Sequence, residues 1–361
     1  MLSALSYARS LGLVTALVIP SRTSLGSQAN QGHAPLPRWV LVYGGAPVRH
    51  KAYPRYTLDD LTRLVAVVDT VGRPTSWLTT GAVFIELYAP SANVFTDWIG
   101  GTPATGADWR EYLDTILAPG GPVARLDSTV GLVTAAIGSL GGPYHIAVMI
   151  PYPDTRVDTL RYDGKLYALR KADDGAALAG AYTADVTAKF RAGNFRHLVL
   201  DAMYWLHESI QGADTAVVPA VAVQVHRAGL RFLWIPCFTS PGSFVWRQFG
   251  FDETWMQPNY FFTPTLPATR VDSAIAIARR LGMGTELELD DRLLTSPEYA
   301  DRLTPYLSRL AAAPDLRMRA VAIYEGHGGL LALSRSGDPW HRAMYQHLVR
   351  VLQSADSVVT P

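Results

Sequence analysis

The stretch that decides the fold covers residues 144–153 and reads YHIAVMIPYP. Its central HIAVMI run is almost wholly apolar, which is typical of a strand in a parallel sheet that is covered on both faces. Residues 154–170 follow as a loop or a small ribbon, and residues 175–193 have a helical pattern. A buried strand followed by a helix is the repeating unit of a parallel α/β fold.

The same unit recurs along the chain. Eight strand-like segments are predicted, at residues 38–45, 81–90, 144–153, 197–205, 230–238, 253–262, 284–290 and 317–326. A helical segment follows each strand, and the first helix is expected to start at a capping box of Thr57 and Asp60 and to reach Val68. Eight such units are the number that closes a TIM barrel.

A doubly wound open sheet is the alternative that this alternation allows. Such sheets often carry the pattern G-x-G-x-x-G after the first strand when they bind a dinucleotide. Here the first strand runs into GGAPVRH at residues 44–50, which lacks that spacing. No internal repeat or low-complexity linker divides the chain. We therefore expect an α/β fold, a single (β/α)8 TIM barrel over residues 30–361, without a cofactor.

Composition narrows the class of protein. The 361 residues are 48% hydrophobic and 17% charged, which excludes a disordered chain. The formal net charge of +1 gives no field that would gather nucleic acid, so no nucleic-acid partner is expected. The single cysteine, Cys237, excludes an internal disulfide and a cysteine-based zinc cluster.

The N-terminus has the pattern of a signal peptide. Arg9 ends a short first region, residues 10–20 are an apolar stretch too short to span a bilayer, and SQA at 27–29 fits a cleavage site. We expect cleavage after Ala29 and a secreted or periplasmic protein. No later stretch is long and apolar enough to span a membrane.

Polar and aromatic side chains gather at the ends of the predicted strands, where TIM barrels carry their chemistry. The candidate site residues are Glu86, Tyr88, Asp201, Tyr204, Trp205, Glu208, Trp234, Gln257, Asn259, Tyr260, Glu286, Glu288, Tyr324 and Glu325. Because side chains alternate along a strand, Glu286 and Glu288 share one face and should point into the barrel. The same reasoning predicts that Phe84, Glu86 and Tyr88 share the inner face of the second strand.

These residue types favour carbohydrate chemistry. Glycoside hydrolysis needs two carboxyl groups that flank one bond, and the glutamates after strand four and on strand seven supply such a pair. Tyr204, Trp205 and Trp234 are either platforms for sugar rings or part of the barrel core. The two amides, Gln257 and Asn259, could bind hydroxyl groups. Asp201 is expected to point inward, to orient Glu208 or to pair with a neighbour.

Residues 198–290 resemble a bacterial family known as domain of unknown function 4855. The resemblance is carried by YWLHESI at 204–210, VHRAGLRFLWIPCF at 225–238, Trp246 with GFD at 250–252, QPNYFF at 257–262 and GTELELD at 284–290. It extends over most of the chain after residue 29 and implies a barrel with a carbohydrate role. Cys237 stands where the resemblance leads us to expect a tyrosine.

A broader resemblance is to the clan A glycoside hydrolases, which retain the anomeric configuration. It implies Glu208 as the acid/base and Glu288 as the nucleophile, with Glu286 as a competitor for the second role. Tyr260 is similar to the tyrosine that often touches the nucleophile in that clan. The chain departs from the clan pattern at His207, where an asparagine usually precedes the acid/base.

Two other function classes remain open from the sequence. One is a catalytically inactive barrel that only binds a glycan. The other is a metal-assisted hydrolase that uses Glu86, Asp201 and Glu288 as oxygen ligands. The sequence has no H-E-x-x-H motif, no G-x-S-x-G elbow and no phosphate-binding P-loop.

Overall fold

The computed structural model describes residues 38–45, 56–313, 315, 321–326 and 328–353. The predicted signal peptide, residues 1–29, lies outside the described residues. The barrel belongs to residues 35–361, which form one unit.

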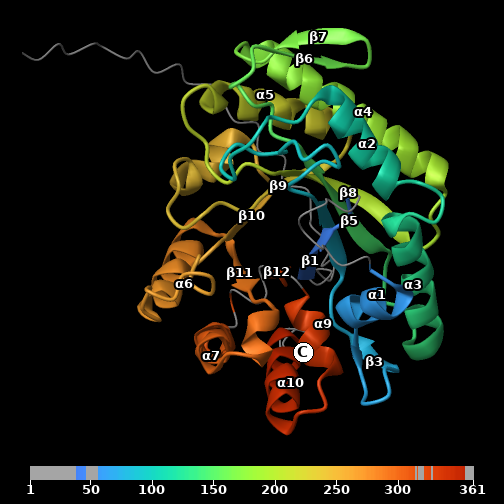
Figure 1. Cartoon of the computed structure of the whole chain (residues 1–361), viewed down its shortest axis with the longest axis vertical. Coiled ribbons are helices and arrows are strands. Elements are labelled where there is room, and N and C mark those ends of the chain that lie inside the picture. Colours follow the sequence, from blue (N-terminus) through green and yellow to red (C-terminus); the bar gives the residue numbers. More distant parts are fainter. Residues whose placement is uncertain (1–37, 46–55, 314, 316–320, 327, 354–361) are drawn as a thin grey trace, which may run out of the picture. The chain divides into compact units, whose positions relative to one another are not determined.

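Eight parallel strands close into a barrel, as the alternation of strands and helices predicts (Figure 1). The strands, in their order around the barrel, are β1 (Arg38–Tyr43), β12 (Val321–Tyr324), β11 (Gly284–Glu288), β10 (Glu253–Met256), β9 (Arg231–Trp234), β8 (Leu198–Trp205), β5 (Tyr144–Ile150) and β4 (Gly81–Ile85). The first strand pairs with both β4 and β12, and this double pairing closes the ring. The (β/α)8 TIM barrel is therefore confirmed.

Helices surround the strands (Figure 1). They are α1 (Leu58–Val65), α2 (Gly106–Ile116), α3 (Pro122–Ile137), α4 (Ala172–Gly193), α5 (Asp214–Arg227), α6 (Thr269–Leu281), α7 (Pro297–Ala311), α9 (Gly329–Arg335) and α10 (Pro339–Gln353), with the 3-10 helices η1 (Ser243–Phe249) and η2 (Asp291–Leu294). None of the described helices combines the length and apolarity needed to cross a membrane.

Two small hairpins form sheets of their own, separate from the barrel. Residues 154–170, predicted to be a loop or a small ribbon, contain an antiparallel pair, β6 (Thr159–Tyr162) and β7 (Lys165–Ala168). The capping box of Thr57 and Asp60 starts α1 as predicted. The predicted extension of that helix to Val68 is wrong, because residues 66–68 form β2 (Ala66–Val68), which pairs with β3 (Pro74–Trp77). Two of these three residues are valines, whose branched side chains favour strands over helices.

Several barrel strands end earlier than the apolar pattern predicts. Pro151 directly follows β5, and Pro236 and Pro258 come two residues after β9 and β10. Proline has no N–H to donate to a sheet, so the ladder cannot continue through it. The residues beyond these points are therefore loops at the carboxyl end of the barrel, and several of them carry polar side chains.

The carboxylate of Asp108 holds the long connection between β4 and α2, residues 86–105, in place. Asp108, in the first turn of α2, forms a capping box with Thr105. It also accepts hydrogen bonds from Ser91 Oγ at 2.7 Å and Asn93 Nδ2 at 2.9 Å. Burial alone would raise the pKa of Asp108, but the hydrogen bonds from Asn93, Thr105 and Ser91 outweigh it and hold the pKa below its usual range.

We expect the substitution Asp108→Asn to lower the free energy of unfolding by about 1–2 kcal/mol at neutral pH, because it weakens a helix cap and two loop contacts. A carboxyl with a depressed folded-state pKa stabilises the protein above its unfolded pKa and loses that effect as the pH falls through its folded pKa. The free energies of unfolding of the wild-type protein and of Asp108→Asn should therefore become equal at acidic pH. Urea unfolding at neutral and acidic pH measures this difference.

The matched control is Asp301→Asn, an exposed aspartate on α7, which should change the free energy by no more than about 0.5 kcal/mol. A loss at Asp108 that stayed constant down to acidic pH would contradict the role assigned to its charge.

Candidate active site

A cavity of about 400 Å³ opens at the carboxyl ends of the barrel strands. This is the end of the barrel at which TIM-barrel enzymes place their chemistry. Its lining consists of aromatic and aliphatic side chains, one thiol, two amides and three carboxyl groups. The lining residues are Leu41, Tyr43, Ile85, Leu87, Trp98, Tyr204, Leu206, Glu208, Cys237, Gln257, Asn259, Phe262, Glu286, Glu288 and Tyr324.

Of the three carboxyl groups that line the cavity, Glu288 has the most hydrogen-bond donors. It ends β11 and accepts backbone N–H groups from Asn259 at 2.9 Å, Tyr260 at 3.0 Å and Phe261 at 3.3 Å. The Tyr306 hydroxyl on α7 donates a fourth hydrogen bond. Burial raises the pKa of Glu288, and these four donors oppose that rise by stabilising the charged form.

Those three N–H groups converge because the chain turns sharply after β10. Asn259 has a left-handed backbone with φ of 49°, a conformation that asparagine tolerates better than most residues. Its side-chain oxygen accepts the backbone N–H of Phe238 at 2.7 Å, which anchors the turn. Consecutive backbone N–H groups in such turns form concave sites for anions, and here the anion is Glu288.

Glu208 follows β8 and has two side-chain donors. Its Oε1 accepts from Gln257 Nε2 at 2.9 Å, and its Oε2 accepts from the thiol of Cys237 at 2.7 Å. Burial is the largest influence and raises the pKa of Glu208, although Cys237 and Gln257 oppose it. Burial and the charge of Glu208 also raise the pKa of the Cys237 thiol, so the thiol keeps its proton and donates it.

A relay of two amides connects the two glutamates. Gln257 donates to Glu208 and accepts from Asn259 Nδ2 at 2.7 Å, while the backbone of Asn259 donates to Glu288. This series of hydrogen bonds begins at Glu208 and ends at Glu288, and it holds both carboxyl groups at fixed positions. Both amides were candidates from the sequence, and the structure brings both to the cavity.

Glu286 lies one alternation step before Glu288 and also lines the cavity, as the period-two pattern predicts. Its pKa is raised well above the usual range, first by burial and then by the charges of Glu288 and Glu208. No hydrogen bond or ion pair reaches its side chain from the residues that the structure describes. The three carboxyl groups therefore differ mainly in the number of donors they receive.

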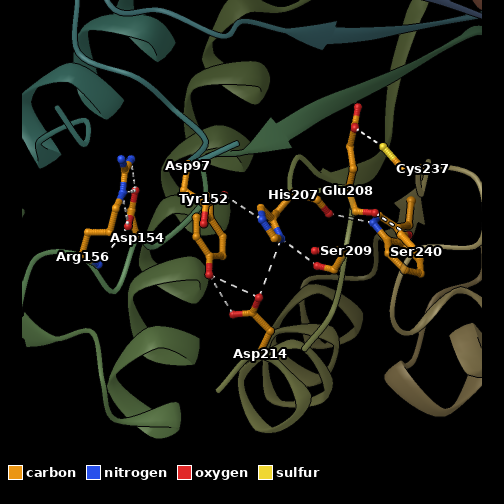
Figure 2. Close-up of polar contacts among 11 residues, drawn as sticks. Asp97, Tyr152, Asp154, Arg156, His207, Glu208, Ser209, Asp214, Cys237 and Ser240 are labelled. Carbon is orange, nitrogen blue, oxygen red and sulfur yellow. Dashed lines mark hydrogen bonds and ion pairs between the residues drawn. The ribbon is translucent and has the colours of Figure 1, made fainter. Parts of the chain in front are cut away.

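The residue before Glu208 points the other way, into a separate polar cluster (Figure 2). His207 stacks on the ring of Tyr152 with centroids 4.2 Å apart. Its Nδ1 faces the carbonyl oxygen of Ser209 at 2.7 Å, and its Nε2 faces a carboxylate oxygen of Asp97 at 2.8 Å. Each ring nitrogen thus lies within hydrogen-bond distance of an acceptor oxygen, one on either side of the ring.

This cluster ties the loop of residues 86–105 to the end of β8. Asp97 belongs to that loop, and its neighbour Trp98 lines the cavity with 51% of its surface exposed. The second acidic neighbour of the ring, Asp214, accepts the Tyr152 hydroxyl, and burial raises the pKa of Asp214 to about 6. The contact between His207 and Asp97 thus holds the loop whose exposed indole lines the same cavity as Glu208.

Trp98 is not among the residues predicted from the sequence, which include two other tryptophans. Trp205 and Trp234 are fully buried and do not line the cavity. Trp205 packs against Tyr152 and Phe232, and Trp234 stacks on Phe251. Their candidate role as sugar platforms is therefore replaced by a role in the core. Trp98 lies in a loop, and no periodic pattern marks such a position.

The predicted inner face of β4 is wrong by one residue. Ile85 and Leu87 line the cavity, whereas Glu86 does not. Glu86 accepts the N–H of Leu87 at 2.8 Å, and its charge raises the pKa of the Tyr112 hydroxyl on α2. Tyr88 instead forms a bridge with Val94 in the following loop. Both faces of β4 are buried, so alternation alone could not tell the inner face from the outer one.

Asp201 does not approach Glu208. It lies near the start of β8, where it pairs with the Arg231 guanidinium and lies 3.1 Å from His145 Nδ1. These partners outweigh burial and hold the pKa of Asp201 at about 2. The proposed metal ligand set of Glu86, Asp201 and Glu288 is therefore not brought together, because each of these carboxyl groups is held by different neighbours.

Two further candidates take other roles. Tyr260 gives Glu288 its backbone N–H, while its ring lies under the Arg302 guanidinium at 3.7 Å. The tyrosine hydroxyl that touches Glu288 comes from Tyr306 instead. Glu325 accepts the Tyr56 hydroxyl at 3.2 Å outside the cavity, and burial raises its pKa to about 8.

We expect the substitution Tyr306→Phe to raise the pKa of Glu288 further, because it removes a donor that favours the charged form. The pKa of Glu325, which has a separate set of partners, should not change. NMR titration of the ¹³C-labelled glutamate carboxyl groups measures both values. A Glu288 pKa that fell or stayed constant would contradict the assigned hydrogen bond.

The chain matches a known family and is similar to several solved structures. Residues 38–350 match the family described as "Domain of unknown function (DUF4855)". No match is found among curated proteins. The chain is similar to an alpha-amylase from Malbranchea cinnamomea, with a TM-score of 0.45 and 11% identity over 89% of this chain and 77% of that one. It is also similar to concanavalin B, with a TM-score of 0.39 and 13% identity over 88% of this chain and 98% of that one.

Proposed function

The chain belongs to the family described as domain of unknown function 4855, and we propose that it is a glycoside hydrolase acting on a polysaccharide or oligosaccharide. The observation that carries the proposal is the pair Glu208 and Glu288, which line one cavity at the carboxyl end of the barrel in different environments. Glycosidic cleavage needs two such carboxyl groups with separate roles.

Glu208 takes the role of general acid. Burial raises the pKa of Glu208, and its partners are a thiol and an amide, neither of which carries a positive charge. A proton kept on this group can pass to the oxygen of the leaving sugar. The fixed contacts with Gln257 and Cys237 hold the carboxyl group in one orientation toward the cavity.

Glu288 takes the role of the charged carboxylate that attacks the anomeric carbon. Four donors support its negative charge, more than support either of the other two carboxyl groups. In a retaining mechanism this group forms the glycosyl-enzyme bond, and Glu208 then activates the water that breaks it. Trp98 would offer its exposed indole face to a sugar ring at the mouth of the cavity.

We expect Glu208→Gln and Glu288→Gln each to lower the rate of glycan hydrolysis at least about 10²-fold, because each removes one of the two acid/base or nucleophilic groups. Release of reducing ends from a panel of neutral, acidic and amine-bearing glycans measures the activity. The first-formed anomer, read by ¹H NMR, should retain the configuration of the substrate.

Glu325→Gln is the matched control, since Glu325 is a buried carboxyl directly after the neighbouring strand β12 and does not line the cavity. It should leave the rate within about threefold. A wild-type chain that binds glycans and hydrolyses none would favour the inactive, glycan-binding barrel.

We propose in addition that the protein is exported and that residues 1–29 are removed. The apolar stretch at 10–20 and the SQA site at 27–29 support this proposal. Expression of the full chain in a bacterial host with a Sec pathway should yield a processed protein that begins at Asn30. Recovery of the unprocessed chain from the cytoplasm, shown by N-terminal sequencing, would contradict it.

A further inference from the structure

The proposed mechanism assigns no role to Glu286, the third carboxyl group of the cavity. Glu286 is 3% exposed, lines the cavity, and receives no hydrogen bond from the described part of the chain. Glu208 has two donors and Glu288 has four. A buried polar group without a partner is costly, so an unpaired carboxyl facing a cavity indicates a ligand group that completes it.

The charge of the cavity indicates what kind of group this is. Three carboxyl groups line the cavity, and none of the lining residues is a lysine, arginine or histidine. Like charges in a partly dry cavity disfavour one another, and the charge of Glu288 acts on Glu286, as does that of Glu208 whenever Glu208 has lost its proton. A cation bound among them would offset this repulsion, whereas an acidic sugar would increase it.

We propose that the cavity accepts a sugar that carries a protonated amino group, and that Glu286 binds this ammonium. The inference rests on the proposed function, because it names the substrate class of the same site. An ammonium group has three donors, so it can contact Glu286 and still donate to a neighbouring oxygen in the cavity. A hydroxyl group has one donor and no charge, so it leaves the repulsion among the carboxyl groups in place.

The rim of the cavity fits the same ligand. The half-exposed indole of Trp98 offers a flat apolar face, and Tyr43, Tyr204 and Tyr324 add further rings to the lining. Aromatic faces attract cations as well as sugar rings, and tryptophan does so most strongly. The amide relay of Gln257 and Asn259 leaves Glu286 aside, so its carboxyl group is available to the ligand.

The test compares two oligosaccharides that differ only in the charge of one substituent. Tetramers of glucosamine and of N-acetylglucosamine, and the corresponding galactosamine pair, are titrated by calorimetry into the full chain carrying Glu208→Gln, which blocks turnover under the proposed mechanism. For at least one pair we expect the free amine to bind about tenfold or more tightly than its acetylated form, the range of a charge-assisted hydrogen bond. Equal or weaker binding of both amines would overturn the proposal.

The role of Glu286 is tested by two further variants in the same background. Glu286→Gln should bring the binding of the amine and the acetylated sugar to within about twofold of each other, and Glu286→Asp should keep the preference. Because no hydrogen bond is lost at Glu286→Gln, its Tm should not fall. A preference that persists in Glu286→Gln would contradict the assignment, and Glu325→Gln serves as the buried control that should keep it.

Measurements of binding and of hydrolysis test the amine-binding role of Glu286 and the proposed glycosidase activity separately. Hydrolysis of neutral glycans without any preference for amines would overturn the inference and leave the glycosidase proposal standing. Tight binding of the amine that depends on Glu286, with no glycan hydrolysed by the wild-type chain, would support the inference and overturn the enzymatic role.

Discussion

The closure of the barrel through β1 is the constraint on which the rest of the structure depends. This strand pairs in parallel with β4 on one side and with β12 on the other. Closure brings the carboxyl ends of eight strands to one opening, so residues as distant in the sequence as Tyr43 and Tyr324 share a hydrogen bond of 3.1 Å. The cavity exists because residues from seven of these strands, or from the loops that follow them, meet at this opening.

Inside that opening, the supply of hydrogen-bond donors differentiates three similar carboxyl groups. Glu288 is surrounded by backbone N–H groups that a left-handed turn at Asn259 aims toward it. Glu208 contacts neutral side chains, and Glu286 receives no donor among the described residues. The environment sets the charge that each group prefers, and the proposed roles of carboxylate, acid and ligand-binding group rest on this difference.

His207 supports the site from outside the cavity. It is held between the Ser209 carbonyl and Asp97, and through Asp97 it holds the loop that carries Trp98 (Figure 2). The clan pattern of asparagine before the acid/base is replaced here by a residue that points away from the cavity. His207 therefore has a structural role at this position, because it joins a long loop to the strand that ends near Glu208.

The sequence alone determined the eight strand-and-helix units, the first helix cap and the inward direction of Glu286 and Glu288, because these depend on local periodicity and local hydrogen bonds. It could not assign the inner face of β4 or the burial of Trp205 and Trp234, since both faces of those strands are apolar. Only the tertiary structure decided the partners of Asp201, the donors of Glu288 and the position of Trp98. Those contacts join residues far apart in the chain, and their geometry follows from barrel closure and from loops that carry no periodic signal.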